Sequence, residues 1–209
     1  MNAREEVLAR IAAALGPDVQ APVVPRAYGQ AGREPPESPM LAERFCDRVA
    51  EYSARVHRAA PGGIDDSVAA ACSARGSRRL VAAPDAKWRP PGLEIVPDDV
   101  GTDPRELEQF DAALTGCVLA VAETGTIALD GGQLCGRRAL TLVPDHHICI
   151  VRADQIVAGV PDAIAALADA ARARQPVTLV SGPSATSDIE LERVEGVHGP
   201  RLLDVIVVS

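Results

Sequence analysis

The stretch that decides the fold is CVLAVAETGTIALDGGQLCGRRALTLVPDHHICIV, at residues 117–151. Its short apolar runs are the strongest strand signals of the chain, and they lie at 117–123, 126–130, 139–143 and 147–151. The turns between them are Thr124-Gly125, Gly131-Gly132 and Pro144-Asp145. Because these turns are too short for crossover helices, we expect antiparallel hairpins here and a mixed sheet in the domain.

On either side of this stretch, helical and strand patterns alternate, which is typical of an α/β fold. Apolar residues at helical spacing or capping signals predict helices at 40–58, 64–75, 103–115 and 160–174, the last with Ile164, Leu167 and Ala171 facing inward. Short apolar runs predict strands at 80–83, 93–96, 177–180 and 203–208. We expect the strands at 177–180 and 203–208 to be buried.

The first 39 residues differ in character from the rest. Residues 3–15 place Val7, Leu8, Ile11 and Leu15 on one helical face, and Gly16-Pro17 ends that helix. Six prolines between 17 and 39 indicate a linker, or an arm lying over the surface. The expected organisation is a helix and proline-rich arm at 1–39, followed by one domain at 40–209.

The composition excludes several classes of protein. A formal net charge of −8 and 2% aromatic residues argue against nucleic-acid binding, which requires a basic surface. The only lysine, Lys87, lies outside any glycine loop, so a Walker-type phosphate site is not expected. No apolar run approaches the roughly 20 residues needed to span a bilayer. These features predict a soluble protein that handles small molecules.

The five cysteines lie at 46, 72, 117, 135 and 149, without any C-x-x-C spacing. This pattern predicts neither a zinc site nor an iron–sulfur cluster, and we expect no cofactor and no metal in this chain. The odd number of cysteines and the lack of a secretory signal favour a cytoplasmic protein with buried thiols.

The first candidate site is the turn Glu123-Thr124-Gly125-Thr126, where a carboxylate and two hydroxyls follow a strand. Strand ends are the usual ligand positions of α/β folds. The alternative is that Glu123 only accepts hydrogen bonds within its own hairpin. The second candidate is His146-His147. Neighbouring strand residues point to opposite faces, so we expect one histidine to act as a general base and the other to be structural.

The third candidate is the loop SGPSATSDIE at 181–190, which follows a strand and is rich in glycine and hydroxyls. Its potential ligand-binding residues are Ser181, Gly182, Ser184, Thr186, Asp188 and Glu190. Ser187 and Glu190 also have capping-box spacing, so the alternative is that this segment only starts a helical turn.

The fourth candidate is His198, held between turn-forming residues in GVHGP at 196–200.

Four segments together resemble the LUD domain of the lactate-utilisation protein C family: AETGTI at 122–127, LVPDHHICIV at 142–151, SGPSATSDIE at 181–190 and RVEGVHGP at 193–200. The resemblance covers roughly residues 40–209. It implies a three-layer α/β/α fold with a mixed sheet, of the NagB, ribose-5-phosphate isomerase and CoA-transferase type. It also implies a role in oxidising L-lactate to pyruvate beside sister proteins, one of which carries iron–sulfur clusters.

Lactate oxidation releases two electrons, and this chain has neither a C-x-x-C pair nor a G-x-G-x-x-G loop to conduct them. We therefore expect a non-redox subunit that binds substrate or serves assembly, with Arg137, Arg138 or Arg193 holding a small carboxylate. Two alternatives stay open. One is a stand-alone cyclo-ligase-like or CoA-transferase-like enzyme that uses Glu123 and a histidine, and the other is a regulatory module that senses a carboxylate. All of these readings require the polar turns to meet in a common cleft.

Overall fold

A computed structural model describes residues 2–17, 20, 22–25, 38–186, 194–196 and 198–209 of the chain. Its centre is a six-stranded sheet in which every neighbouring pair of strands is parallel. The strand order is β1 (Arg55–Ala59), β12 (Leu202–Val208), β7 (His146–Arg152), β4 (Ala112–Thr115), β2 (Arg79–Ala82) and β3 (Glu94–Pro97). Parallel strands buried on both faces explain the nearly continuous apolar runs of β7 and β12.

A second sheet supplies the antiparallel pairs. Its order is β8 (Ile156–Val157), β5 (Leu119–Val121), β6 (Thr126–Leu129) and β9 (Thr178–Val180). β5 and β6 form the expected hairpin, and β9 pairs antiparallel with β6. A small two-stranded sheet joins β10 (Ala185–Thr186) to β11 (Val194–Glu195). The six-stranded sheet is therefore entirely parallel, whereas the second sheet is mixed, because β5 and β8 pair in parallel.

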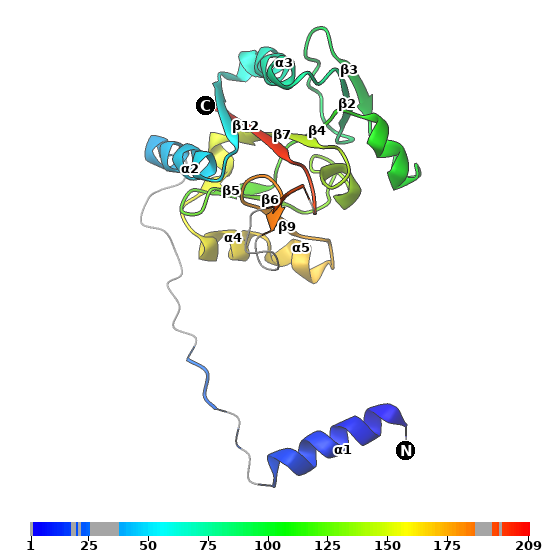
Figure 1. Cartoon of the computed structure of the whole chain (residues 1–209). Coiled ribbons are helices and arrows are strands. Elements are labelled where there is room, and N and C mark those ends of the chain that lie inside the picture. Colours follow the sequence, from blue (N-terminus) through cyan, green and yellow to red (C-terminus); the bar gives the residue numbers. More distant parts are fainter. Residues whose placement is uncertain (1, 18–19, 21, 26–37, 187–193, 197) are drawn as a thin grey trace.

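Helices lie on both sides of the six-stranded sheet (Figure 1). α3 (Ile64–Arg75) covers one face, and α2 (Pro39–Glu51) packs on the other face beside the second sheet. α4 (Val160–Ala166) and α5 (Ala168–Arg172) follow β8, and α4 covers the outer face of the second sheet. The chain thus has the expected α/β fold with helices outside the sheets.

The alternation of side chains along β7 and β12 divides the interior into two apolar clusters. Cys149, Val151 and Val205 face α2 and the second sheet. Ile148 and Ile206 face α3. Because successive strand residues point to opposite faces, a single strand contributes to both clusters.

One predicted strand and one predicted hairpin are wrong. Residues 139–143 do not form a strand, since the short 3-10 helix η3 (Arg138–Thr141) occupies this place. The strand predicted at 147–151 forms as β7, but it lies between β4 and β12 in parallel with both, so it has no hairpin partner. The turn before it only returns the chain to the amino end of the large sheet.

Two predicted helices end earlier than expected. α2 stops at Glu51, and the chain then enters β1. The apolar residue Val56, which the spacing assigned to the helix, therefore belongs to a strand. The N-cap at Asp103 is confirmed, because its carboxylate accepts from the amide of Arg105 at 2.9 Å. Only the 3-10 helix η2 (Pro104–Gln109) follows, and residues 112–115 are the central strand β4. Strand pairing on both sides overrides their helical propensity.

The remaining differences concern exposure. In the segment predicted as one helix at 160–174, Leu167 is buried as expected, whereas Ile164 and Ala171 are exposed and Ala163 takes the inward position. β9 is not a buried strand, because it is the edge of its sheet and leaves 52% of Leu179 exposed. The other short 3-10 helices are η1 (Pro61–Gly63) and η4 (Ala153–Gln155).

The predicted helix at the start of the chain forms as α1 (Ala3–Leu15), capped by Asn2, whose side chain accepts from the amide of Glu5 at 2.9 Å. None of its residues is buried, and its apolar face of Val7, Leu8, Ile11 and Leu15 is exposed. Much of the proline-rich arm, 18–19, 21 and 26–37, lies outside the described residues. All five cysteines are free and buried, as expected.

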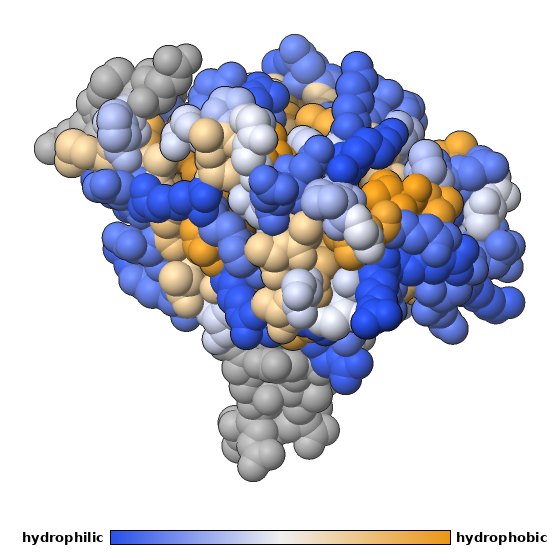
Figure 2. All heavy atoms as spheres, turned by 90° about the horizontal axis from the view of Figure 1, so that it is seen from above, coloured by the Kyte–Doolittle hydropathy of each residue, from blue (hydrophilic) through white to orange (hydrophobic). Residues whose placement is uncertain are grey.

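The outer surface is polar over the helix-covered face. Seen from above, the side that carries α3 shows mainly hydrophilic side chains with small apolar areas between them (Figure 2). Within the described residues, no helix combines the length and apolar composition that crossing a bilayer requires.

Candidate functional site

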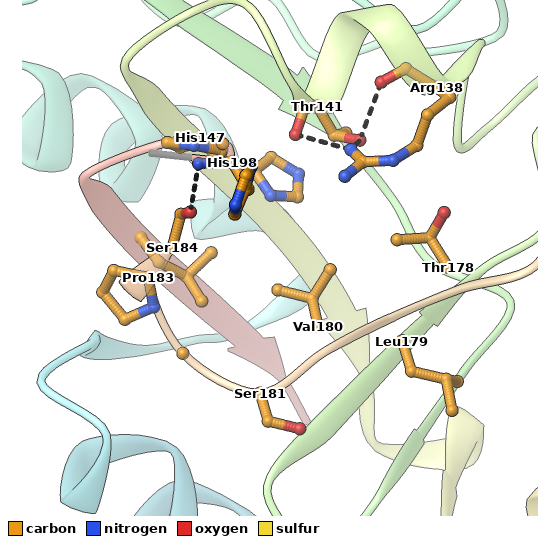
Figure 3. A pocket seen from close by; sticks show the side chains of 14 residues that line it. Arg138, Thr141, His147, Thr178, Leu179, Val180, Ser181, Pro183, Ser184 and His198 are labelled. Carbon is orange, nitrogen blue, oxygen red and sulfur yellow. Dashed lines mark hydrogen bonds between the residues drawn. The ribbon is translucent and has the colours of Figure 1, made fainter. Parts of the chain in front are cut away.

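The main candidate site is a cavity of about 220 Å³ at the amino ends of β7 and β12. β9 forms one wall, and the loops at 181–184 and 198–200 form another. Figure 3 shows Arg138 and Thr141 on one side and Ser184 on the other, with the imidazoles of His147 and His198 between them. The lining residues are Arg138, Thr141, His147, Thr178, Leu179, Val180, Ser181, Gly182, Pro183, Ser184, His198, Gly199, Pro200 and Leu203.

His147 is the buried polar group of this cavity. Its Nε2 lies 2.8 Å from the hydroxyl of Thr115 on the neighbouring strand β4. Burial, with smaller contributions from the nearby His146 and Arg138, lowers the pKa of His147 to about 3. The imidazole is therefore neutral near pH 7, and it can donate or accept a hydrogen bond without adding charge.

Arg138 supplies the positive charge of the cavity. Its Nη1 donates to the carbonyl and the hydroxyl of Thr141 at 3.0 and 3.1 Å, which holds the guanidinium against η3. Among the residues that the structure describes, no carboxylate pairs with Arg138. Since Thr141 uses only part of a guanidinium with five N–H groups, the remaining donors are available to an anion.

Ser184 and His198 come from separate loops that are joined by backbone contacts. The amide of Ser184 donates to the carbonyl of Pro200 at 2.8 Å, and the amide of Gly196 donates to the carbonyl of Ser184 at 2.8 Å. The amide of His198 donates to Oγ of Ser184 at 3.2 Å, so this contact does not use the hydroxyl proton. The exposed imidazole of His198 lies at the mouth.

Gly182 fixes the path of the loop after β9. Its φ is +91°, and a Cβ there would lie 2.5 Å from Cβ and 2.9 Å from the carbonyl oxygen of Tyr52. Only glycine accommodates both this conformation and this close approach. The neighbouring Ser181 shares a hydrogen bond of 2.8 Å with the hydroxyl of Thr126, which in turn lies 2.7 Å from that of Thr124. Thr124 and Thr126 thus reach the cavity only through Ser181.

Glu123 is not among the residues that line this cavity. It is exposed at the end of β5, where its amide donates to the carbonyl of Ala158 at 3.1 Å. Gly125 is also set apart, because it packs against the backbone of α2: a Cβ there would lie 2.7 Å from the amide nitrogen of Val49. The structure therefore brings His147, Ser184 and His198 together without Glu123.

Arg137 and His146 also lie elsewhere. Arg137 forms an ion pair with the buried Asp98 at 2.9 Å and donates to the carbonyl of Thr102, so its neighbour Arg138 takes the place proposed for it. His146 points to the α3 face of the sheet, where it contacts Ser77 and Asp204. The expectation that the two histidines cannot enter one pocket is confirmed by this geometry.

The other sequence candidates have limited descriptions. Thr186 is in β10, paired with Val194. Asp188, Glu190 and Arg193 lie outside the described residues. In the described part of the chain, no group of three or more histidine, cysteine, aspartate or glutamate side chains is placed to hold a metal ion.

Sequence reasoning missed several polar groups beside these histidines. Thr115, Thr141 and Thr178 escaped notice because isolated threonines carry no pattern. Asp204 did carry a signal, since a carboxylate inside the buried strand LLDVIVV requires partners. Its partners are His57, Arg75 and His146.

The chain matches known proteins over most of its length. The family model described as LUD domain matches residues 75–208. Lactate utilization protein C of Deinococcus radiodurans is 46% identical over 172 residues, which is 81% of this chain and 80% of that protein. Uncharacterized protein YkgG of Escherichia coli K12 is 31% identical over 144 residues, or 62% of each chain.

A solved structure supports the same relationship. The crystal structure of a DUF162 family protein from Deinococcus radiodurans superposes with a TM-score of 0.69 at 39% identity, covering 81% of this chain and 97% of that one. The resemblance drawn from four sequence segments is thus confirmed. This chain belongs to the LUD domain family.

Proposed function

We propose that this chain serves lactate utilisation as a non-redox subunit that binds a small carboxylate in the cavity beside Arg138. The relative from Deinococcus radiodurans is named lactate utilization protein C, and it matches four fifths of both chains. That likeness supports the metabolic assignment. The cavity supports the chemical role.

The observation that carries the proposal is an arginine without an acidic partner among the described residues, in a small cavity of mixed polar and apolar lining. The guanidinium matches a carboxylate in charge and in planar geometry. The volume of about 220 Å³ is below the roughly 300–1,000 Å³ of pockets that hold drug-sized ligands. Charge and size together favour a small organic acid.

The neutral polar groups suit a hydroxy acid. His147 and the hydroxyl of Ser184 line the cavity without adding charge, so they can exchange hydrogen bonds with a ligand hydroxyl or carbonyl. A site that pairs one cation with neutral donors and acceptors matches L-lactate and its oxidation product, pyruvate.

The two electrons of lactate oxidation require an acceptor. We propose that they pass to the iron–sulfur clusters of a sister protein, while this chain binds the carboxylate or holds the assembly together. A complex of these proteins is the form in which the activity is expected.

Ligand binding is tested by thermal shift with the purified chain against L-lactate, pyruvate, folates, CoA and nucleotides. A ligand at 100 times its Kd stabilises by about 2.7 kcal/mol, a readily measured shift. We expect stabilisation by L-lactate or pyruvate, its loss in Arg138→Gln, and its retention in the matched surface control Arg172→Gln. No stabilisation by either acid would overturn the binding role.

The cellular role is tested by deleting the gene and growing the cells on L-lactate. Loss of growth, restored by the wild-type chain, supports the proposal, and co-purification with an iron–sulfur protein supports the complex. Unchanged growth contradicts it. A carboxylate-sensing module would show the same ligand binding, but growth would then recover when the other lactate-utilisation proteins are expressed independently.

A further inference from the structure

A second cavity, of about 380 Å³, lies on the α3 face of the six-stranded sheet. It is separate from the carboxylate cavity, because the sheet lies between them. Its lining residues are Arg75, Gly76, Ser77, Glu108, Phe110, Asp111, Val143, Asp145, His146 and Leu202. The proposed function uses none of them.

Ser77, His146 and Asp204 form a continuous hydrogen-bonded chain at this cavity. Oγ of Ser77 lies 3.0 Å from Nδ1 of His146, and Nε2 of His146 lies 3.0 Å from Oδ2 of Asp204. All three residues are buried, and Ser77 and His146 line the cavity. Ser77 follows α3, His146 begins β7 and Asp204 lies within β12, so only the complete fold brings the three side chains together.

The ionisation of Asp204 sets the direction of these hydrogen bonds. Although burial raises its pKa, the hydrogen bonds from His146 and His57, together with the charge of Arg75, hold the pKa of Asp204 well below its usual range. An ionised carboxylate only accepts, so Nε2 of His146 carries the proton that it donates to Asp204. In the neutral imidazole, Nδ1 is then the acceptor for the hydroxyl of Ser77.

The same carboxylate has two further partners. Oδ1 of Asp204 lies 2.6 Å from Nε2 of His57, and Nε of Arg75 donates to Oδ2 at 3.3 Å. These contacts fix the carboxylate, and the carboxylate fixes the imidazole. A base held by a third group beside a hydroxyl is the arrangement of a serine nucleophile and its general base.

We propose that Ser77, His146 and Asp204 form a second functional site, which transfers acyl groups from small esters or thioesters. Ser77 and His146 are its catalytic residues, and Asp204 is a positioning residue. Either ring nitrogen of histidine can act as base, so the use of Nδ1 toward the serine leaves the chemistry unchanged.

The reaction balances without any further reactant except water. Oγ of Ser77 bonds to the acyl carbon while its proton passes to Nδ1 of His146, and that proton then goes to the leaving oxygen or sulfur as the bond to it breaks. Water next adds to the acyl carbon, giving its proton to His146, which returns it to Ser77 when the acid departs.

The charges around the cavity indicate which esters enter. Glu108, Asp111 and Asp145 line it with Arg75. Asp145 is neutralised by Arg201 at 2.7 Å, whereas Asp111 accepts hydrogen bonds from the amides of Arg78 and Arg79 at 2.7 and 2.9 Å. Arg75 is itself paired with the buried Asp204, so Glu108 and Asp111 leave the lining with a negative balance. The site therefore favours uncharged or cationic acyl compounds over anionic ones.

The nucleophile is tested first, with the full chain and a fluorophosphonate probe. We expect one adduct, mapped to Ser77 by peptide mass spectrometry, and none in Ser77→Ala. The matched control is Ser73→Ala, an exposed serine on α3 outside the cavity lining, which keeps the adduct. An adduct on another residue, or no adduct on the folded wild-type chain, overturns the proposal, and neither result depends on whether a variant folds.

Turnover is tested with p-nitrophenyl acetate and its anionic counterpart, the p-nitrophenyl hemisuccinate ester. The acetate is expected to react about tenfold faster or more, because like charges repel the anionic ester.

His146→Gln, with its fold checked by circular dichroism, is expected to lower kcat by about 10²–10⁴. Asp204→Asn is expected to shift the pH profile of kcat to a different midpoint, which a merely structural loss would not do. Equal rates for wild type and Ser77→Ala overturn the proposal.

Discussion

His146 and His147 are neighbours in β7, and their imidazoles point to opposite faces of the six-stranded sheet. The partner strand follows the same alternation: Leu203 lines the cavity of His147, and Asp204 holds His146. One strand pair thus serves two cavities that differ in charge. The cavity of Arg138 suits a small anion, whereas the cavity of Ser77 has acidic walls.

Substitution of Arg137 is predicted to lower stability, and substitution of its neighbour Arg138 is predicted to weaken ligand binding. Arg137→Gln leaves the buried carboxylate of Asp98 without its ion pair, which costs about 3–5 kcal/mol in such sites. At 2–4 °C per kcal/mol for a domain of this size, Tm falls by roughly 6–20 °C. Arg138→Gln should leave Tm nearly unchanged and weaken carboxylate binding by about 10- to 150-fold.

Differential scanning fluorimetry and calorimetric titration of both variants measure the two effects. The surface variant Arg172→Gln is the control for loss of one positive charge, since its partner Asp169 is exposed. If Arg137→Gln weakened binding as much as Arg138→Gln while remaining folded, the assignment of the anion site to Arg138 would be wrong.

His147 is predicted to make stability depend on pH. Its pKa is about 3 in the folded chain and about 6.5 when unfolded, so the unfolded chain binds one more proton between these values. This contribution lowers the free energy of unfolding as pH falls from about 6.5 toward 3, by up to about 1.4 kcal/mol per pH unit. His147→Gln should remove that slope in urea titrations, while His198→Gln, at an exposed position, keeps it. An unchanged slope in His147→Gln would contradict a buried neutral imidazole.

The parts of the fold that local pattern determines were predictable from the sequence. The helix at 64–75 forms with the expected bounds, and the last strand is buried on both faces. Residues 112–115 show where local pattern fails, because alanine and leucine suit a helix equally well. Their position between β2 and β7, which only the complete sheet creates, makes them a strand.

Those features of the site that depend on residues close together in the sequence were predictable. The opposite orientation of His146 and His147 follows from strand geometry, and the loop at 181–184 does line a cavity. The meeting of Ser77 with His146 does not follow, because these residues are 69 positions apart. The choice of Arg138 over Arg137 likewise depends on Asp98, which lies 39 positions away from Arg137.

Gly182 is predicted to be sensitive to the smallest substitution. Gly182→Ala places a methyl group 2.9 Å from the carbonyl oxygen of Tyr52 at a φ of +91°, and backbone cannot move aside cheaply. We expect a loss of about 1–3 kcal/mol, with weaker carboxylate binding because the loop carrying Ser184 shifts. Gly62→Ala is the control, since nothing lies within 4 Å of its Cβ position and its φ is not positive. Equal stability of the two variants in urea titration would show that the loop adapts.

Asp204 is predicted to stabilise the fold at neutral pH, and this contribution to the free energy of unfolding is lost at acid pH. Its carboxylate is fully buried among His57, Arg75 and His146, so Asp204→Asn leaves buried cationic or donor groups unpaired at a cost of about 3–5 kcal/mol near pH 7. The pKa of Asp204 is lowered on folding, so this stability is present above the unfolded pKa of about 3.9 and is lost as pH falls toward the folded pKa. The unfolding free energies of wild type and Asp204→Asn, measured in urea, should therefore differ most at neutral pH and converge below pH 4. Asp169→Asn, with its exposed carboxylate, should follow wild type throughout. A difference between wild type and Asp204→Asn that stays constant down to pH 2 would mean that the cost comes from packing and not from the charge.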